Sequence, residues 1–592
     1  MATFLERLDA QLASFLSDWN LNSTVLVVII ASLILYPILF PVEADTHPLL
    51  LARQSALDPI RNKFQSAIHR SPEAPPGQGL KSGFDLKDAG AARWAAGRDG
   101  DLRDIWREVL MAGTMQPGWA RDGSSEEKLV PTGKIQTVLG REEVVEHDVQ
   151  QMSKQIQIIG QHLKAKGCKK VAIYLPNNLE YLLTIFACSF YGISPILLPY
   201  NLPHPAAYAL INATTADGLV CAAGSLPLDG VAKECSKIRS LVWVVEKTSR
   251  HMDWHGVPHF AKNRLTVNVW HDVVQENLSK TDDDLPTNAS GDAPTDIITF
   301  WDSPTKPQIV PVSHGNMVAA IAALISALPS AQRVGPGDVV LPASSFHQPY
   351  VLCQTLAALY THADLAITSV AQPGVEMATA TRGIRPTAVI ASAETLHTLH
   401  KNERYRRNSV VEEVAKYGYS RSLAAGHLPK QSSLLFRMLS PSNLISQGTK
   451  PLELRLILTS DRLDTPTPAL TSRTLSELRI MTRARICYAL TAPRVAGAVA
   501  QTHVYDYRVH HERDSVSKNF GIPLSSVEIW LEDKNDDAKV GGAQPEGEIV
   551  VSGPAVSGYN RSTGKGAVKL GVKGKFGEDG TLSLSYVTRQ KN

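Results

Sequence analysis

The chain has 592 residues, of which 43% are hydrophobic and 20% charged, and a formal net charge of +3. This length exceeds one ordinary core and predicts two or three structural units, while the composition excludes a wholly disordered protein. The small net charge gives no reason to expect nucleic acid as a partner. The 6 cysteines lie far apart, without a C-x-x-C pair or zinc spacing, so they predict free thiols and no metal site.

An uncharged apolar stretch, TVLVVIIASLILYPILFPV, occupies residues 24–42. It approaches the roughly 20 residues that a helix needs to cross a bilayer, and it predicts one transmembrane helix after a short lumenal or outer tail, residues 1–23. One alternative is a cleaved signal peptide, which the acidic residues before the stretch and the missing small-residue cleavage site disfavour. A buried helix of a soluble domain is the other alternative.

Basic residues predict the orientation of this anchor. Only Arg7 precedes the stretch, whereas four basic residues follow it by residue 70. Because basic residues favour the cytosolic side, the large C-terminal part is expected in the cytosol of a single-pass membrane protein. An uncleaved N-terminal anchor favours the endoplasmic reticulum over the mitochondrial outer membrane or the peroxisome. The lipid bilayer is therefore a predicted partner, through residues 24–42.

Residues 43–139 are predicted to form a connector or adaptor region. They contain a Pro/Gly-rich linker at 71–79 and one short amphipathic helix at 102–111. Such a region offers a docking segment for a protein partner.

Strands and helices alternate over residues 140–510. This rhythm predicts a parallel β-sheet covered by helices on both faces, an α/β core. The clearest helices are expected at 151–166 and 179–191, and the clearest strands at 171–176, 193–200, 241–246, 296–301, 387–392 and 454–460. Over 511–592, short alternating strands separated by Gly and Asp predict a small antiparallel β subdomain.

Five segments carry a pattern shared with a known family: 171–201, 339–367, 452–463, 547–560 and 576–584. Their content and order resemble the large domain of acyl-adenylate-forming enzymes, the AMP-binding superfamily that includes fatty-acyl-CoA synthetases. The resemblance implies parallel sheets covered by helices plus a small antiparallel β subdomain. Phe346 and His347 match the family's P-L-F-H turn, which makes them candidates for an acyl groove.

The family's phosphate loop, T-S-G-T-T-G-x-P-K-G, corresponds here to FWDSPTKPQIV at residues 300–310. Only Ser303 and Thr305 supply hydroxyl groups, Gln308 replaces the family's lysine, and Lys306 lies nearby. A phosphate cradle needs close backbone approach and donors without nearby negative charge. This glycine-free loop with an aspartate therefore predicts a poor phosphate site and is typical of an ordinary connecting turn.

The other nucleotide motifs are also altered. The family's Y-G-x-T-E turn reads Y-A-L-T-A, so Tyr488 and Thr491 remain while Ala492 replaces the magnesium carboxylate. A methyl group cannot ligate a hard cation. Val572 stands where the family's T-G-D aspartate would hold the ribose.

Two further departures concern the adenine loop and the end of the chain. The adenine-loop position carries Ser460 and Asp461 instead of Gly and Ala. The final residues, TRQKN, resemble the hinge that precedes the family's mobile lid, and no sequence for that lid and its catalytic lysine follows.

These departures predict an impaired homologue of the fatty-acid–CoA ligases, a membrane-anchored pseudoenzyme that binds an acyl lipid or acts as a scaffold. Its degenerate nucleotide site would comprise Ser303, Thr305, Lys306, Tyr488 and Thr491, with no cofactor expected. One alternative is an active ATP-dependent long-chain fatty acid ligase that forms acyl-AMP and acyl-CoA. It would use ATP, magnesium and CoA, with those residues as ATP contacts. Another alternative is a structural subunit of a membrane complex, docked through residues 43–139.

Overall fold

The computed structural model describes most of the chain. It excludes residues 1–19, 22, 29–30, 33–42, 88–90, 93, 120–124, 140–142, 246–264, 280–284, 287–293, 302–306, 405–409, 429–453, 464–466, 468–469, 510–517, 534–539, 542–544 and 585–592. Most of the predicted membrane segment, the centre of the phosphate loop and the terminal hinge fall on these residues. Among the residues that are described, no helix has the length and apolar character needed to cross a membrane. The transmembrane helix stays a prediction.

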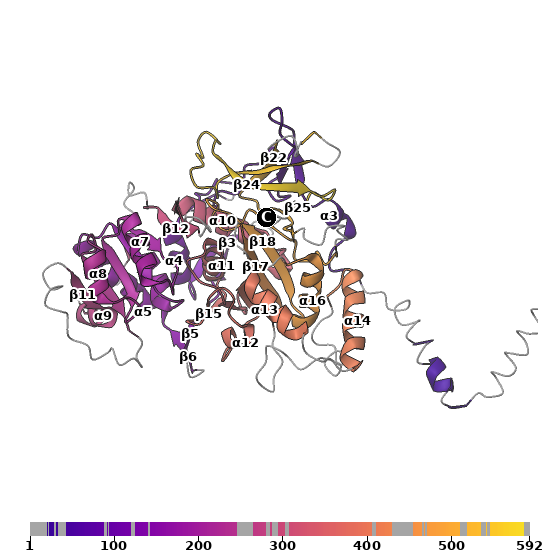
Figure 1. The fold of residues 1–592 in the computed structure, drawn as a ribbon, viewed down its shortest axis with the longest axis horizontal. Coiled ribbons are helices and arrows are strands. Elements are labelled where there is room, and N and C mark those ends of the chain that lie inside the picture. The colour runs from indigo at the N-terminus through magenta and orange to yellow at the C-terminus, as the bar shows by residue number, and fades with distance from the viewer. Residues whose placement is uncertain are drawn as a thin grey trace, which may run out of the picture.

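The first α/β unit is a seven-stranded sheet in the order β11-β10-β9-β7-β8-β12-β13. Its strands run parallel except β13, which returns antiparallel to β12. Figure 1 shows this unit at one end of the molecule. The strands are β7 (Lys170–Tyr174), β8 (Ser194–Leu197), β9 (Gly218–Ala222), β10 (Ser240–Val244), β11 (Thr266–Val269), β12 (Ile297–Trp301) and β13 (Gln308–Val312). The helices are α5 (Val149–Ala165), α6 (Leu179–Tyr191), α7 (His204–Thr214), α8 (Leu228–Glu234) and α9 (Trp270–Asn277).

The second α/β unit is a nine-stranded sheet in the order β21-β19-β18-β17-β16-β14-β15-β5-β6. Its central strands, from β18 to β5, are parallel, and the strands beyond them are antiparallel. The strands are β5 (Ile135–Leu139), β6 (Glu143–His147), β14 (Val339–Pro342), β15 (Asp364–Thr368), β16 (Ala388–Ser392), β17 (Leu456–Arg462), β18 (Arg485–Thr491), β19 (Ala500–Gln501) and β21 (Ile522–Pro523). The helices are α10 (His314–Ser326), η2 (Ser330–Gln332), α11 (Pro349–Tyr360), α12 (Met377–Ala380), α13 (Ala393–Arg404), α14 (Val410–Ala424) and α16 (Ser472–Thr482).

The third part is an antiparallel sheet in the order β1-β2-β22-β23-β24-β25-β20, which lies above the second unit in Figure 1. It confirms the predicted antiparallel strands near the C-terminus and adds two strands from the predicted connector. Its strands are β1 (Ala56–Asp58), β2 (Ile68–Arg70), β20 (Lys518–Asn519), β22 (Glu528–Glu532), β23 (Glu546–Ser552), β24 (Ala567–Phe576) and β25 (Leu582–Leu584), preceded by the short helix α3 (Pro48–Ala52). A separate hairpin joins β3 (Met115–Trp119) to β4 (Ser125–Leu129).

Helix α4 (Leu102–Leu110) lies between the two α/β units, because it contacts α5 and α6 of the first and α10 and α11 of the second. A capping box starts it: Asp101 accepts the backbone N–H of Arg103, and Asp104 accepts that of Asp101. Its apolar face is buried around Trp106, whose Nε1–H donates to Ser153 of α5 at 2.9 Å. The region predicted as a connector thus contributes to the main core.

Asp45, near the start of the predicted connector region, bonds to residues of the second unit. Its carboxylate accepts hydrogen bonds from Tyr507 at 2.7 Å and Arg485 at 2.9 Å, and lies 2.9 Å from His427 Nδ1. Burial alone would raise the pKa of Asp45, but the hydrogen bonds from Tyr507 and Arg485 outweigh it and hold the pKa below 3.8. The charged form is therefore the one that the folded state stabilises.

Asp45→Ala is expected to lower the free energy of unfolding by about 1.5–3 kcal/mol at pH 7, since it removes hydrogen bonds to a charged group. A carboxylate with a depressed folded pKa contributes stability above its unfolded pKa and loses it as the pH falls through its folded pKa. The difference between wild type and variant should therefore shrink below pH 3.8. Urea unfolding across this range measures it, with the exposed Asp229→Ala as the control. An undiminished difference at low pH would contradict the assignment.

Candidate nucleotide and acyl site

The predicted phosphate loop connects β12 to β13. The two strands pair antiparallel, with Trp301 opposite Gln308. Gln308 is exposed at the start of β13. Ser303, Thr305 and Lys306 lie outside the described residues, and their role in ATP binding stays a prediction.

The helix start that follows this loop is structural in character. The Ser313 hydroxyl accepts the backbone N–H of Asn316 at 3.1 Å, which caps α10. The Asn316 amide donates to the carbonyls of Pro554 and Val556 at 2.7 and 3.0 Å. His314 is buried, and burial lowers its pKa to about 4. Asn316 therefore connects α10 to the segment that precedes β24.

Asp461 is the centre of a buried polar cluster, which we call the Asp461 cluster. Tyr488 Oη donates to Asp461 Oδ2 at 2.7 Å, and Thr467 Oγ1 donates to Asp461 Oδ1 at 2.6 Å. Lys518 Nζ forms an ion pair with the same carboxylate, and the side chains of Lys518 and Asp461 are only 5% and 2% exposed. Thr491 donates from its hydroxyl to the backbone carbonyl of Asp461 at 2.9 Å. Tyr488, Thr467, Lys518 and Thr491 are thus all bonded to Asp461.

The Asp461 cluster stands where the family resemblance expects an adenine loop. Ser460 and Asp461 instead continue β17, which pairs with β18 as far as Arg462 opposite Thr491. Tyr488 is fully buried, and its ring lies 4.8 Å from that of Phe520. With its hydroxyl bonded and its ring enclosed, Tyr488 presents no exposed face on which a base could stack.

The positions that correspond to the family's magnesium and ribose ligands carry apolar side chains here. Ala492 is buried at the end of β18, and Val572 is a partly buried residue of β24 that packs against the main core. Among the residues that the structure describes, no group of three or more His, Cys, Asp or Glu side chains is placed to hold a metal ion. The described side chains at these positions do not fit a magnesium-bound nucleotide.

Phe346 and His347 lie between β14 and α11, in a turn that contacts Asn177 in the 171–201 segment of the first unit. The Phe346 N–H donates to Asn177 Oδ1 at 2.9 Å, and the Asn177 amide donates to the Ser344 carbonyl at 2.8 Å. His347 Nδ1 lies 2.8 Å from Ser345 Oγ. Burial, aided by the charge of Arg462, lowers the pKa of His347 to about 3, so its imidazole is neutral near pH 7. The structure thus brings together two separate family motifs.

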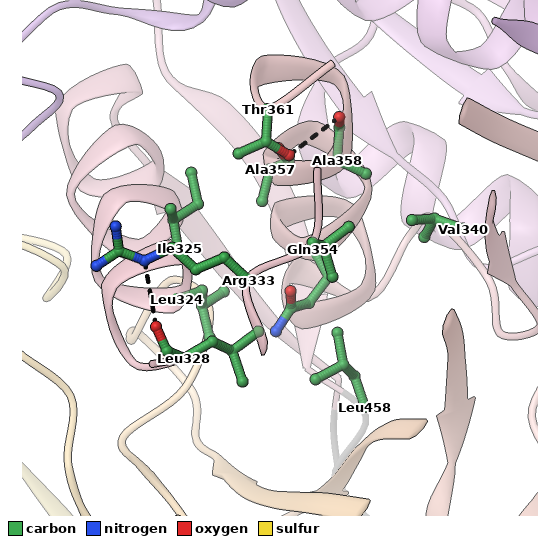
Figure 2. Close-up of a pocket in the computed structure, with 11 residues that line it drawn as sticks. Leu324, Ile325, Leu328, Arg333, Val340, Gln354, Ala357, Ala358, Thr361 and Leu458 are labelled. Carbon is green, nitrogen blue, oxygen red and sulfur yellow. Dashed lines mark hydrogen bonds between the residues drawn. The ribbon is translucent and has the colours of Figure 1, made fainter. Parts of the chain in front are cut away.

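A pocket lies farther along α11, as Figure 2 shows. It holds about 330 Å³ of empty space, including its open mouth, and its lining is mainly aliphatic. Phe346, His347 and Tyr488 are not among the lining residues, so the pocket is separate from the predicted groove. The lining residues are Leu324, Ile325, Leu328, Arg333, Val334, Val340, Gln354, Ala357, Ala358, Thr361 and Leu458. The exposed Arg333 places one cation beside this apolar space.

Sequence reasoning finds part of this arrangement. It identifies Asp461, Tyr488 and Thr491 as positions of the nucleotide site, but it misses Lys518, which lies 57 residues from Asp461 in the chain. No spacing rule links these two residues, and only the approach of β20 to β17 pairs them. The pocket is missed for the same reason, because two helices and two strands build it.

The comparisons with known proteins agree with this fold. The family model for AMP-binding enzymes matches residues 136–559, so the chain belongs to the AMP-binding enzyme family. A search of curated proteins finds no match.

Solved structures share the fold at low sequence identity. A long-chain-fatty-acid-CoA ligase (FadD1) from Archaeoglobus fulgidus has 14% identity and a TM-score of 0.55, with 86% of each chain covered. A putative long-chain-fatty-acid CoA ligase from Rhodopseudomonas palustris has 16% identity and a TM-score of 0.53, covering 82% of this chain and 98% of that one. The N-terminal domain of FACL13 from Mycobacterium tuberculosis has 13% identity and a TM-score of 0.53, covering 82% and 99%.

Proposed function

We propose that this chain is a membrane-anchored member of the AMP-binding family with impaired nucleotide chemistry, which binds an acyl lipid or acts as a scaffold. The Asp461 cluster carries this proposal. A buried carboxylate bonded to a lysine, a tyrosine and a threonine is a satisfied structural network, and the tyrosine that would stack on adenine is part of it. The methyl group of Ala492 in place of a carboxylate supports the same conclusion.

The acyl part of the proposal is supported by the pocket along α11. Its enclosed space is only about 20 Å³, so the pocket admits a hydrocarbon chain only when the side chains that line it move apart. An aliphatic lining suits a hydrocarbon chain, and Arg333 lies where it could pair with a carboxylate at the pocket mouth. The scaffolding part rests on residues 43–139, our proposed docking region for a protein partner; within its described part, Asp45 bonds to the second unit and α4 packs between the two α/β units. The predicted location is the endoplasmic reticulum membrane.

Nucleotide binding tests this function directly. Calorimetry on the full chain in detergent is expected to show no magnesium-dependent ATP binding, while a long-chain fatty acid binds. Pyrophosphate release with a panel of fatty acids should stay at background, because losing several charge-stabilising groups at about 3–4 kcal/mol each removes many powers of ten in rate. Turnover typical of the family, abolished in Lys306→Ala, would establish an active ATP-dependent ligase instead.

A further inference from the structure

A strip of exposed apolar side chains follows the predicted membrane segment. We call residues 47–64 the juxtamembrane strip; it begins five residues after the end of the 24–42 stretch and contains α3, β1 and the turn before β2. Single exposed apolar side chains are ordinary on a protein surface, whereas several within one short segment make that segment a candidate interaction surface. The exposed fractions are 72% for Leu49, 65% for Leu50, 50% for Leu57, 61% for Ile60 and 63% for Phe64.

The backbone beneath this strip is fixed to the domain. Leu51 is buried and Leu49 and Leu50 are exposed, while the backbone N–H of Gln54, just after α3, donates to the Asp579 carbonyl at 2.8 Å. Helix α3 is therefore docked on the domain. β1 pairs with β2, which in turn pairs with β22. The Phe64 carbonyl accepts the backbone N–H of Asp533 at 3.2 Å. The apolar side chains are therefore presented by an ordered frame.

Phe64 is held outward in an unfavourable conformation. Its φ of +70° lies in the left-handed region, where a bulky side chain is strained by roughly 1–3 kcal/mol. Its ring remains largely in solvent, and the ammonium group of Lys63 lies 5.2 Å from the ring centroid. A strained aromatic side chain that is 63% exposed in the chain itself is a candidate contact for a further surface.

The charges of the strip identify the kind of partner. Arg53, Arg61 and Lys63 are exposed; Arg61 is paired with Asp58, the single acidic residue of the strip, at 2.7 Å and with Glu528 at 2.6 Å, which leaves Arg53 and Lys63 as its basic surface. Exposed leucine, isoleucine and phenylalanine interleaved with arginine and lysine form the composition that lies at the boundary of an anionic bilayer. The predicted anchor would place that boundary only a few residues away.

We propose that the juxtamembrane strip lies in the headgroup region of an anionic bilayer, as a second membrane contact that fixes the orientation of the large domain. The proposal rests on the membrane anchoring in the proposed function. Leu49 and Leu50 enter the acyl boundary from α3, and Ile60 and Phe64 enter it from the turn between β1 and β2. Arg53 and Lys63 contact lipid phosphates.

Site-directed spin labelling tests this contact on the full chain. The native cysteines are all buried, so a single introduced cysteine can be labelled selectively. Four variants are reconstituted separately into nanodiscs of phosphatidylcholine and phosphatidylserine: Leu50→Cys, Phe64→Cys, Ala31→Cys in the predicted anchor, and Lys233→Cys as an exposed control on α8. Power saturation with oxygen and with a water-soluble nickel complex reports the depth of each label. Thermal unfolding confirms that each variant is folded.

The labels at residues 50 and 64 are expected to shift toward oxygen accessibility and away from nickel accessibility, as in a bilayer, whereas the label at 233 stays aqueous. Aqueous labels at either 50 or 64 would overturn the proposal, including the case in which a protein partner covers the strip. The label at residue 31 distinguishes failure of the predicted anchor from failure of the second membrane contact. If it is in hydrocarbon while 50 and 64 are aqueous, the anchor stands and the second contact fails; if it is aqueous while 50 and 64 are inserted, the anchor fails and the contact stands.

Discussion

Lys518→Met is expected to destabilise the protein by about 3–5 kcal/mol, because it leaves the Asp461 carboxylate buried without its cation. The two side chains are only 5% and 2% exposed, so water cannot replace the lost partner without opening the structure. The ion pair also joins β20 of the antiparallel sheet to β17 of the second α/β unit. Urea unfolding of the purified chain, followed by circular dichroism, measures the loss of free energy.

The double variant Asp461→Asn/Lys518→Met is the matched control. Asparagine keeps an acceptor for one of the two hydroxyls, those of Tyr488 and Thr467, and its NH2 group donates to the oxygen of the other, while the unpaired charge is removed. Replacing both members of a buried ion pair is often close to neutral, so this variant should recover most of the lost stability. A loss below about 1 kcal/mol in Lys518→Met itself would mean that the pair is hydrated. The site would then be more open than the structure indicates.

Much of the fold follows from local sequence patterns. The apolar run at 179–191 predicts α6 with its exact bounds, Leu179–Tyr191, and its end at Gly192 has a φ of +68°, which glycine adopts without strain. Short β-rich runs likewise predict β7, β10, β12, β16 and the C-terminal strands. The ordered family motifs predict the adenylate-forming architecture that the family match confirms.

The remaining features depend on contacts between distant segments. The residues predicted to form the adenine loop belong to strand β17 instead. Asp461 can be buried there because its carboxylate bonds to Lys518, Tyr488 and Thr467. β1 and β2 are too short to show a period of two. β2 becomes a strand by pairing with β22, and β1 by pairing with β2. Propensity over a few residues cannot anticipate such pairing.

Trp106→Ala is expected to cost about 3–5 kcal/mol, the range for truncating a large aromatic side chain in a core. Trp106 is 1% exposed, its ring lies 5.0 Å from that of Phe186, and its indole N–H donates to Ser153 at 2.9 Å. The variant would leave a cavity where α4 meets α5 and α6, and the Ser153 hydroxyl would lose the hydrogen bond that it accepts while keeping the one that it donates to the Val149 carbonyl. Chemical denaturation measures the change.

The matched control is Trp94→Ala, the same substitution at a tryptophan that is 78% exposed in the same 43–139 region. It should change stability by no more than about 0.5 kcal/mol, since it creates no cavity. Equal effects of the two variants would contradict the placement of α4 in the core. A large effect of Trp106→Ala alone means that residues 43–139 cannot be removed without unfolding the α/β units. A deletion of this region would then lose a binding partner for structural reasons, so surface substitutions are needed to test docking.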